Sequence, residues 1–269
     1  MERHHFETDL QALKNRLLNM GALVEERVHG AIQALMERNL ESAEAIAKGD
    51  EEVNALQIEI DDRCLKLLAL QQPMASDLRL ITSAMKINAD LERIGDQEVN
   101  ELQIEIDDRC LKLLALQQPL ASDLRLITAA MKINADLERI GDQAVNIAEQ
   151  AVRILAHPPL KPMIDLPRMA QIAEKMTRES LDAFVRKDAK LARAILARDD
   201  EVDQLKDQVF RVLLTYMMAD PGTIERALGL ILVSRHLERI ADHATNIAED
   251  VIFVVEAKDV RHHHEERQA

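Results

Sequence analysis

Residues 137–150 read "LERIGDQAVNIAEQ" and residues 237–250 read "LERIADHATNIAED". In both stretches a glutamate, an aspartate, an asparagine and a second glutamate follow one another at steps of four, four and three residues. These steps place the four polar side chains on one stripe of an α-helix. Apolar residues recur between them at three- and four-residue spacing, which is typical of amphipathic helices packed in bundles. The two stretches therefore predict one long helix in each of two related halves.

The composition also indicates an all-α protein. The chain has 269 residues, and its apolar content of 47% is enough for a buried core. Aromatic residues make up only 2%, and Trp is absent, which favours long helices over sheets. Prolines occur only in loops between the apolar stripes, as expected for residues that interrupt helices. We expect helices at residues 5–47, 51–71, 75–95, 98–117, 121–156, 168–198, 200–218 and 223–257.

The second half of the chain is a diverged copy of the first. The phrase "RDDEVDQL" at residues 198–205 repeats "KGDEEVNAL" at residues 48–56, and the "LERI" stretches repeat each other. Amphipathic helices of this number are best covered in two related three-helix bundles in tandem. The predicted domains are an N-terminal bundle at 5–156, a linker at 157–167, a C-terminal bundle at 168–257 and a polar tail at 258–269.

A near-verbatim tandem duplication of 46 residues lies inside the first half. Residues 53–98 and 99–144 differ only at Ala55/Glu101, Met74/Leu120, Ser83/Ala129 and Glu98/Ala144. We expect the duplication to add a helical hairpin to the N-terminal bundle. The junction "GDQEVN" at residues 95–100 leaves two alternatives open: a single helix over 75–117, which favours domain exchange between chains, or a turn at Gly95.

Charge and cysteine content limit the possible partners and compartment. The net charge of −14 disfavours binding to nucleic acid and to anionic lipid. The two cysteines, Cys64 and Cys110, are copies of one parent residue among apolar neighbours, so we expect buried thiols in a reducing, cytoplasmic compartment. The longest aliphatic run, "VIFVV", is far too short to span a bilayer, and membrane insertion is not expected.

The repeated polar stripe is the strongest candidate site. Carboxylate and amide oxygens on one helix face are ligands for hard cations, although a solvated acidic face on a metal-free helical scaffold is the alternative. The candidate metal-ligating residues are Glu138, Asp142, Asn146 and Glu149 in the first half, Glu238, Asp242, Asn246 and Glu249 in the second, and Glu92 and Asp96 in the duplicated copy. Iron, zinc, manganese and magnesium are all compatible with this set.

Four phrases together resemble the PhoU family, the accessory proteins of bacterial phosphate-specific transport. They are the repeated "LERI[GA]D", "QPxASDLRLI" at residues 72–81 and 118–127, "LLTYMMADPGTI" at 213–224 and "DVRH" at 259–262. The resemblance implies two three-helix bundles, often dimeric, that bind metal through E-x-x-x-D motifs and carry out no catalysis. It also implies regulation of phosphate uptake and starvation signalling through contacts with a transporter ATPase subunit and a sensor histidine kinase.

Other candidate sites are weaker. His262, His263 and His264 form a small cluster in the polar tail, and His236 and His243 flank the second polar stripe. An enzyme built as a carboxylate-bridged di-metal bundle requires Glu-x-x-His on two helices. The chain has one mid-helix example, Glu26 with His29, and the second half holds no counterpart.

Overall fold

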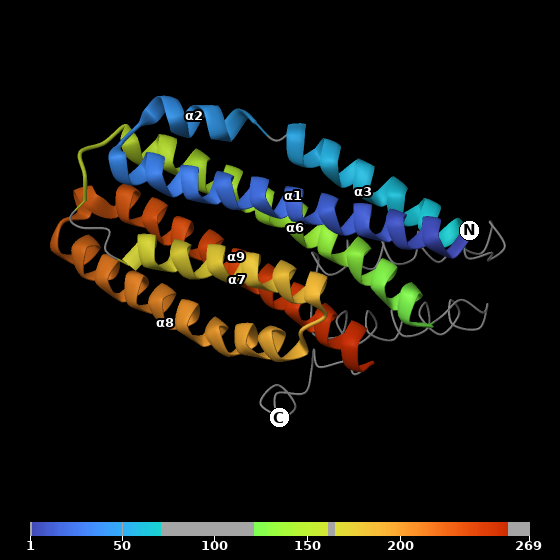
Figure 1. Cartoon of the computed structure of the whole chain (residues 1–269). Coiled ribbons are helices and arrows are strands. Elements are labelled where there is room, and N and C mark those ends of the chain that lie inside the picture. Colours follow the sequence, from blue (N-terminus) through green and yellow to red (C-terminus); the bar gives the residue numbers. More distant parts are fainter. Residues whose placement is uncertain (1, 50, 71–120, 161–164, 258–269) are drawn as a thin grey trace, which may run out of the picture.

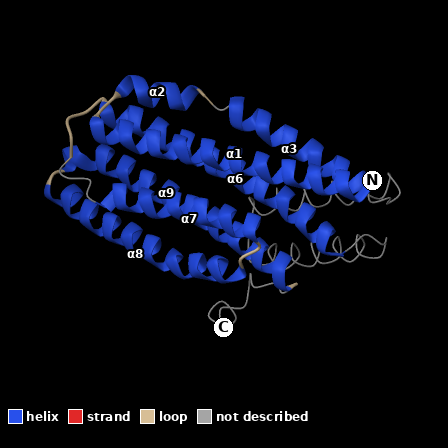
Figure 2. Ribbon diagram, viewed as in Figure 1, coloured by secondary structure: helices blue, strands red, loops and turns tan. Residues whose placement is uncertain are grey.

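The structure is a computed structural model and describes residues 2–49, 51–70, 121–160 and 165–257. These residues form helices and short connections without strands, which confirms the predicted all-α fold (Figure 2). The elements are α1 (Glu2–Glu37), α2 (Leu40–Lys48), α3 (Glu51–Leu70), α6 (Ala121–Leu155), α7 (Asp165–Arg186), α8 (Ala189–Ala219), the 3₁₀ turn η1 (Pro221–Thr223) and α9 (Ile224–Glu256).

The helices pack as two groups, and each group has three parts that contact one another. In the first group α1, α6 and the α2–α3 pair contact one another, and in the second group α7, α8 and α9 do so. The groups meet along α6 and α9 and along α1 and α7. Figure 1 shows α2 and α3 on one side of the molecule and α8 on the other, with the remaining helices between them. One continuous apolar core therefore runs through both halves.

Two helix breaks differ from the sequence prediction. The single helix predicted at 5–47 is wrong, because the chain breaks at Arg38 and restarts behind Asn39. Arg38 has a φ of 58°, and the Asn39 side chain accepts a 3.0 Å hydrogen bond from the Ser42 N–H. A left-handed residue followed by a capping side chain ends one helix and starts the next.

The second half breaks at the matching place. Lys187 has a φ of 56°, and the Asp188 carboxylate accepts a 2.9 Å hydrogen bond from the Leu191 N–H. The break predicted near residue 199 is wrong, because α8 runs unbroken from Ala189 to Ala219. The first half breaks there at Gly49, a poor helix former, whereas the aligned residue of the second half is Arg198.

The two copies of the duplicated segment contribute different helices. Helix α3 comes from the first copy, and α6 takes residues 121–144 from the second copy. The predicted helices at 75–95 and 98–117, and the alternatives at Gly95, lie outside the described residues. The predicted linker is described only in part, since residues 161–164 lie outside the description.

Close helix packing places glycine and small residues at the contacts. A Cβ added to Gly141 on α6 would lie 3.2 Å from the nearest methyl carbon of Val53 on α3. Gly141 stands within the "LERIGD" phrase, so the apolar side of this helix faces α3 and α1. Cys64 is fully buried on α3, as predicted, while Cys110 lies outside the described residues. The packing of Gly141 against Val53 holds the polar stripe of α6 in one orientation.

Candidate functional site

The two polar stripes lie on α6 and α9, the helices through which the halves contact each other. They do not have the same exposure to solvent. On α6, Glu149 is exposed, whereas its counterpart on α9, Glu249, is only 5% exposed. The other stripe residues are half-buried except Asp242, which is exposed: Glu138, Asp142, Asn146, Glu238 and Asn246. Glu92 and Asp96 lie outside the described residues.

Helix α8 brings further charges to the stripe of α9. The Lys206 Nζ atom lies 2.7 Å from the Asp203 Oδ1 atom and 3.0 Å from the Glu238 Oε1 atom. Asp199, one turn before Asp203, acts electrostatically on Asp242. We call this group, Asp199, Asp203, Lys206, Glu238 and Asp242, the C-terminal acidic cluster. It combines four carboxylates with one ammonium group.

The charges in the C-terminal acidic cluster shift two pKa values. Desolvation raises the pKa of Asp242 to about 7, and the carboxylates of Glu238, Asp199 and Asp203 add to this effect, against His243. The protein atoms packed around the carboxyl group account for the desolvation, although one side of Asp242 faces solvent, where water screens the charge. Desolvation lowers the pKa of Lys206, but hydrogen bonds to Asp203 and Glu238 outweigh it and the net shift is upward. Lys206 therefore stays protonated at neutral pH.

Lys206 was not among the site residues predicted from the sequence. The signal was present, because Lys206 follows directly on the repeated phrase "RDDEVDQL". Counted from the helix caps Asn39 and Asp188, Asp203 and Lys206 align with Asn54 and Gln57 on α3. The first half thus has amides where the second half has a carboxylate and an ammonium group.

The first half connects α3 and α6 by amide hydrogen bonds. The Asn134 side chain donates to the backbone carbonyl of Gln57 at 3.0 Å and to the Asp61 carboxylate at 3.1 Å. Asn134 stands one turn before Glu138 on α6, and it is buried. This contact fixes α3 beside the polar stripe of α6.

The two histidines that flank the stripe of α9 contact α6 instead. The His236 Nδ1 atom lies 2.8 Å from the Gln143 Oε1 atom, and the His243 Nδ1 atom lies 3.1 Å from the Asp136 Oδ1 atom. Burial lowers the pKa of His236, and Arg239 and Arg235 lower it further. Both imidazoles thus serve the contact between the halves.

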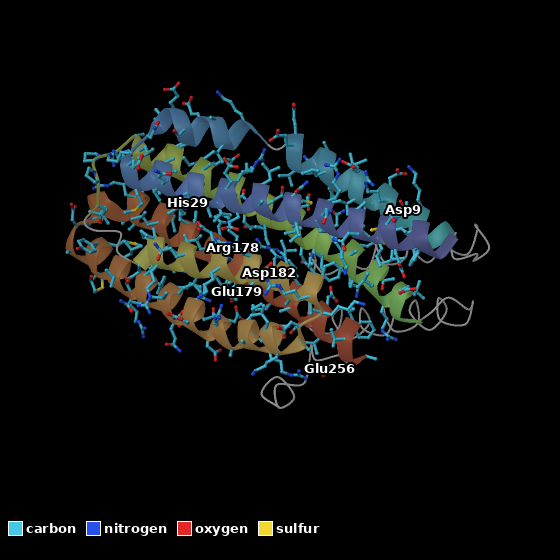
Figure 3. The ribbon with its side chains drawn as sticks, in the orientation of Figure 1. Asp9, His29, Arg178, Glu179, Asp182 and Glu256 are labelled. Carbon is cyan, nitrogen blue, oxygen red and sulfur yellow. The ribbon has the colours of Figure 1, made fainter. Side chains whose placement is uncertain are left out.

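Of the predicted Glu26 and His29 pair, His29 contacts the other half of the chain. The His29 Nδ1 atom lies 3.5 Å from the Glu174 Oε1 atom on α7, and Arg178 of α7 pairs with Glu25. Figure 3 labels His29 on α1 and Arg178 on α7. These ion pairs join α1 to α7. His29 therefore faces a carboxylate of the other half.

The oxygen atoms of both stripes are of the type that binds hard cations, but a metal site also requires several of them to converge on one point. In the parts of the chain that the structure describes, no group of three or more His, Cys, Asp or Glu side chains is placed to hold a metal ion. In the C-terminal acidic cluster the ammonium of Lys206 occupies the space beside Glu238. As arranged, the residues around Glu238 and Asp242 do not fit a metal ion. The tail residues His262, His263 and His264 lie outside the described residues.

Comparison with known proteins identifies the family. The PhoU domain model matches residues 17–98, 96–151 and 166–251, which together make up most of the chain. The chain belongs to the PhoU family. The three matches, one more than the two halves, reflect the duplicated segment of the first half.

Curated PhoU homologues align over almost their whole length. The phosphate-specific transport system accessory protein PhoU homolog of Aquifex aeolicus is 35% identical over 256 residues, covering 95% of this chain and 95% of that protein. The PhoU homolog of Caulobacter vibrioides is 41% identical over 253 residues, covering 94% and 90%. The crystal structure of PhoU from Pseudomonas aeruginosa superposes with a TM-score of 0.73 at 33% identity, covering 94% of this chain and all of that chain.

Among the described residues, no helix combines the length and apolar character needed to cross a bilayer.

Proposed function

We propose that the protein regulates phosphate uptake and phosphate-starvation signalling as an accessory protein of a phosphate-specific transport system. The observation that carries this proposal is the 35% identity to a PhoU homolog over 95% of both chains. Both halves of the family's fold are also present in the structure. The protein acts by binding rather than by catalysis, with the transporter ATPase subunit and a sensor histidine kinase as partners. It works in the cytoplasm as a homo-oligomer.

Complementation tests this proposal. In a bacterium that lacks its own PhoU gene, the full chain should restore repression of a phosphate-starvation reporter at high phosphate. An empty vector gives the unrepressed level, and the strain's own PhoU gives the fully repressed level. A soluble chain, expressed at the level of the strain's own protein, that leaves the reporter fully active would reject the proposal.

Metal binding by the polar stripes is a separate proposal. Carboxylate oxygens from Glu138 and Asp142 on α6 would hold iron, zinc, manganese or magnesium, with Asn146 and Glu149 further along the helix. The amides of Asn54 and Gln57, which stand at the positions of Asp203 and Lys206, bring no ammonium to this stripe. We expect Asp142→Ala to remove more metal than Asp242→Ala from protein purified without chelator, as measured by elemental analysis. Equal metal content in wild type and both variants would contradict metal binding.

The rival function, a di-metal bundle enzyme, gains no support from His29. That residue would have to share a metal with Glu26, but its imidazole faces Glu174 across the contact between the halves. The contact with Glu174 gives His29 a role that involves no metal ion.

A further inference from the structure

We propose that Lys206 is the built-in counter-ion of the C-terminal acidic cluster and that it keeps divalent metal ions off Glu238 and Asp242. The ammonium group bridges two helices, since Asp203 stands on α8 and Glu238 on α9. Both contacts have the lengths of charge-assisted hydrogen bonds. The polar stripe of α9 is thus neutralised by the chain itself.

The position of the ammonium group decides against a metal ion. A cation that binds Glu238 must approach a carboxylate that Lys206 already contacts, at 3.0 Å from its Oε1 atom. The side chains of Lys206 and Glu238 are 29% and 22% exposed, so water screens their attraction less than that of a surface pair. A metal ion bound there would either displace the ammonium group or lie beside its positive charge, and both arrangements are electrostatically unfavourable.

Asp203 positions the lysine. It stands three residues before Lys206 on α8, a spacing that brings the two side chains to the same helix face. Its 2.7 Å contact turns the ammonium group toward α9. The stripe of α9 also includes Asp242, and the carboxylates of Asp199 and Asp203 raise the pKa of Asp242 by charge repulsion. The cluster therefore needs a cation, and Lys206 supplies it.

The first half provides an internal comparison. Its aligned residue, Gln57, carries no charge, and its backbone carbonyl accepts a hydrogen bond from Asn134. The family's motif residues are present on both α6 and α9, and on α9 the ammonium group of Lys206 contacts the motif residue Glu238. The two stripes of this chain are therefore predicted to differ in their affinity for cations.

The experiment measures manganese binding with and without the lysine. All proteins carry Asp142→Asn, so that the stripe of α6 contributes little and the signal reports the C-terminal acidic cluster. Isothermal titration with MnCl₂ compares the Asp142→Asn protein with versions that add Lys206→Gln, Lys206→Arg or Lys175→Gln. Lys175 lies exposed on α7 and pairs with Glu179 at 3.9 Å, so its substitution makes the same charge change away from the cluster.

We expect Lys206→Gln to strengthen manganese binding by about tenfold or more, since it removes a positive charge within about 4 Å of the ligands. Lys206→Arg and Lys175→Gln should bind manganese as weakly as the Asp142→Asn protein. Manganese should also raise the melting temperature of the Lys206→Gln protein more than that of the others. Equal affinities with and without Lys206 would overturn the proposal.

A second measurement uses the unmodified chain and does not depend on the folding of a variant. Acetic anhydride acetylates deprotonated lysines, and peptide mass spectrometry gives the rate for each site. Lys206 should react more slowly than Lys175, and micromolar MnCl₂ should leave its rate unchanged. Fast acetylation of Lys206, or acceleration by micromolar MnCl₂, would show that the ammonium group does not hold the cluster.

Discussion

The contact between His243 on α9 and Asp136 on α6 has a counterpart, which is formed by the corresponding residues of the other half. The His243 Nδ1 atom lies 3.1 Å from the Asp136 Oδ1 atom, and in the aligned "LERI" stretches these positions correspond to Gln143 and His236. His236 and Gln143 also contact each other, at 2.8 Å. The same two sequence positions therefore form a contact between α6 and α9 twice. In the second contact each position lies on the other helix.

The same relationship holds between α1 and α7. Aligned from the caps Asn39 and Asp188, Glu25 corresponds to Glu174, and His29 corresponds to Arg178. Glu25 pairs with Arg178, and Glu174 pairs with His29. Contacts that recur with exchanged partners are the mark of an isologous interface. The halves of this chain pack against each other as the subunits of a two-fold dimer do.

The buried pair at α6 and α9 should be costly to break. Asp136 is 6% exposed and lies near both His243 and Arg139, so Asp136→Ala removes the carboxylate that contacts the imidazole of His243 and the guanidinium of Arg139. We expect a loss of about 3 kcal/mol in the free energy of unfolding. The control is Asp62→Ala, which breaks an exposed pair with Lys66 and should cost about 0.5 kcal/mol. Urea unfolding at pH 7 measures both; equal losses would contradict the interface assignment.

Glu174 should make stability depend on pH. Burial raises its pKa; Glu25 adds to this, while His29 and Arg178 oppose it. A raised pKa in the folded state favours the protonated form, so this contribution to stability is present below the unfolded value of 4.5 and is lost as the pH rises through the folded value. Glu174→Gln should therefore stabilise the protein relative to wild type at pH 8.5 and bring no gain at pH 4.5.

The pH series needs a control with the same charge change. Glu44 is an exposed carboxylate on α2, and Glu44→Gln should show the same small effect at both pH values. Urea unfolding across this range gives the comparison. A Glu174→Gln gain that is as large at pH 4.5 as at pH 8.5 would argue against ionisation as its cause.

Gly21 should be intolerant of a side chain where α1 meets α7. A Cβ at this position would clash with the Leu181 Cδ1 atom, and Leu181 is buried. We expect Gly21→Ala to cost about 1–3 kcal/mol through overpacking. Gly30→Ala on the same helix would meet only the terminal methyl of Ile46 at 3.0 Å. That variant should be neutral, or gain up to about 1 kcal/mol from helix propensity. A Gly21→Ala protein as stable as wild type would show that the two helices can separate at little cost.

The break between α7 and α8 should favour glycine. Lys187 holds a φ of 56°, a left-handed conformation that costs a residue with a Cβ about 1 kcal/mol. Lys187→Gly should therefore raise the melting temperature. Lys190→Gly, in the first turn of α8, should lower it through lost helix propensity. Differential scanning calorimetry of both variants makes the comparison, and a fall for both would show that the break does not need this conformation.

Deletion of either duplicated copy should give proteins of unequal stability. Removing residues 99–144 rebuilds α6 from the first copy and places Glu98 at the position of Ala144, which is fully buried. Removing residues 53–98 keeps α6 and changes only the exposed Ala55 of α3 to Glu101. We expect the first deletion to be less stable by about 3 kcal/mol, because it buries a carboxyl group. Urea unfolding of the two equally long chains tests this, and equal midpoints would contradict the assignment of α6 to the second copy.

The predictable part of this protein lies in its local patterns. Apolar spacing and proline positions predicted the approximate extents of three described helices, α3, α6 and α9, and the "LERI" phrases put the stripe residues on one face of α6 and α9. The helix breaks were misjudged because Arg38 and Lys187 adopt a left-handed conformation for which their residue type gives no signal. Their caps, Asn39 and Asp188, were readable in principle.

By itself, the sequence determined the helical fold, the relation between the halves and the identity of the polar stripes, because helix periodicity is a local property of the chain. Tertiary structure alone decided which residues meet across helices. It brought Lys206 to Glu238, paired His243 with Asp136, and took α3 from one copy of the duplication and α6 from the other. Identical stretches of sequence have the same local preferences, so only packing against the rest of the core can distinguish them.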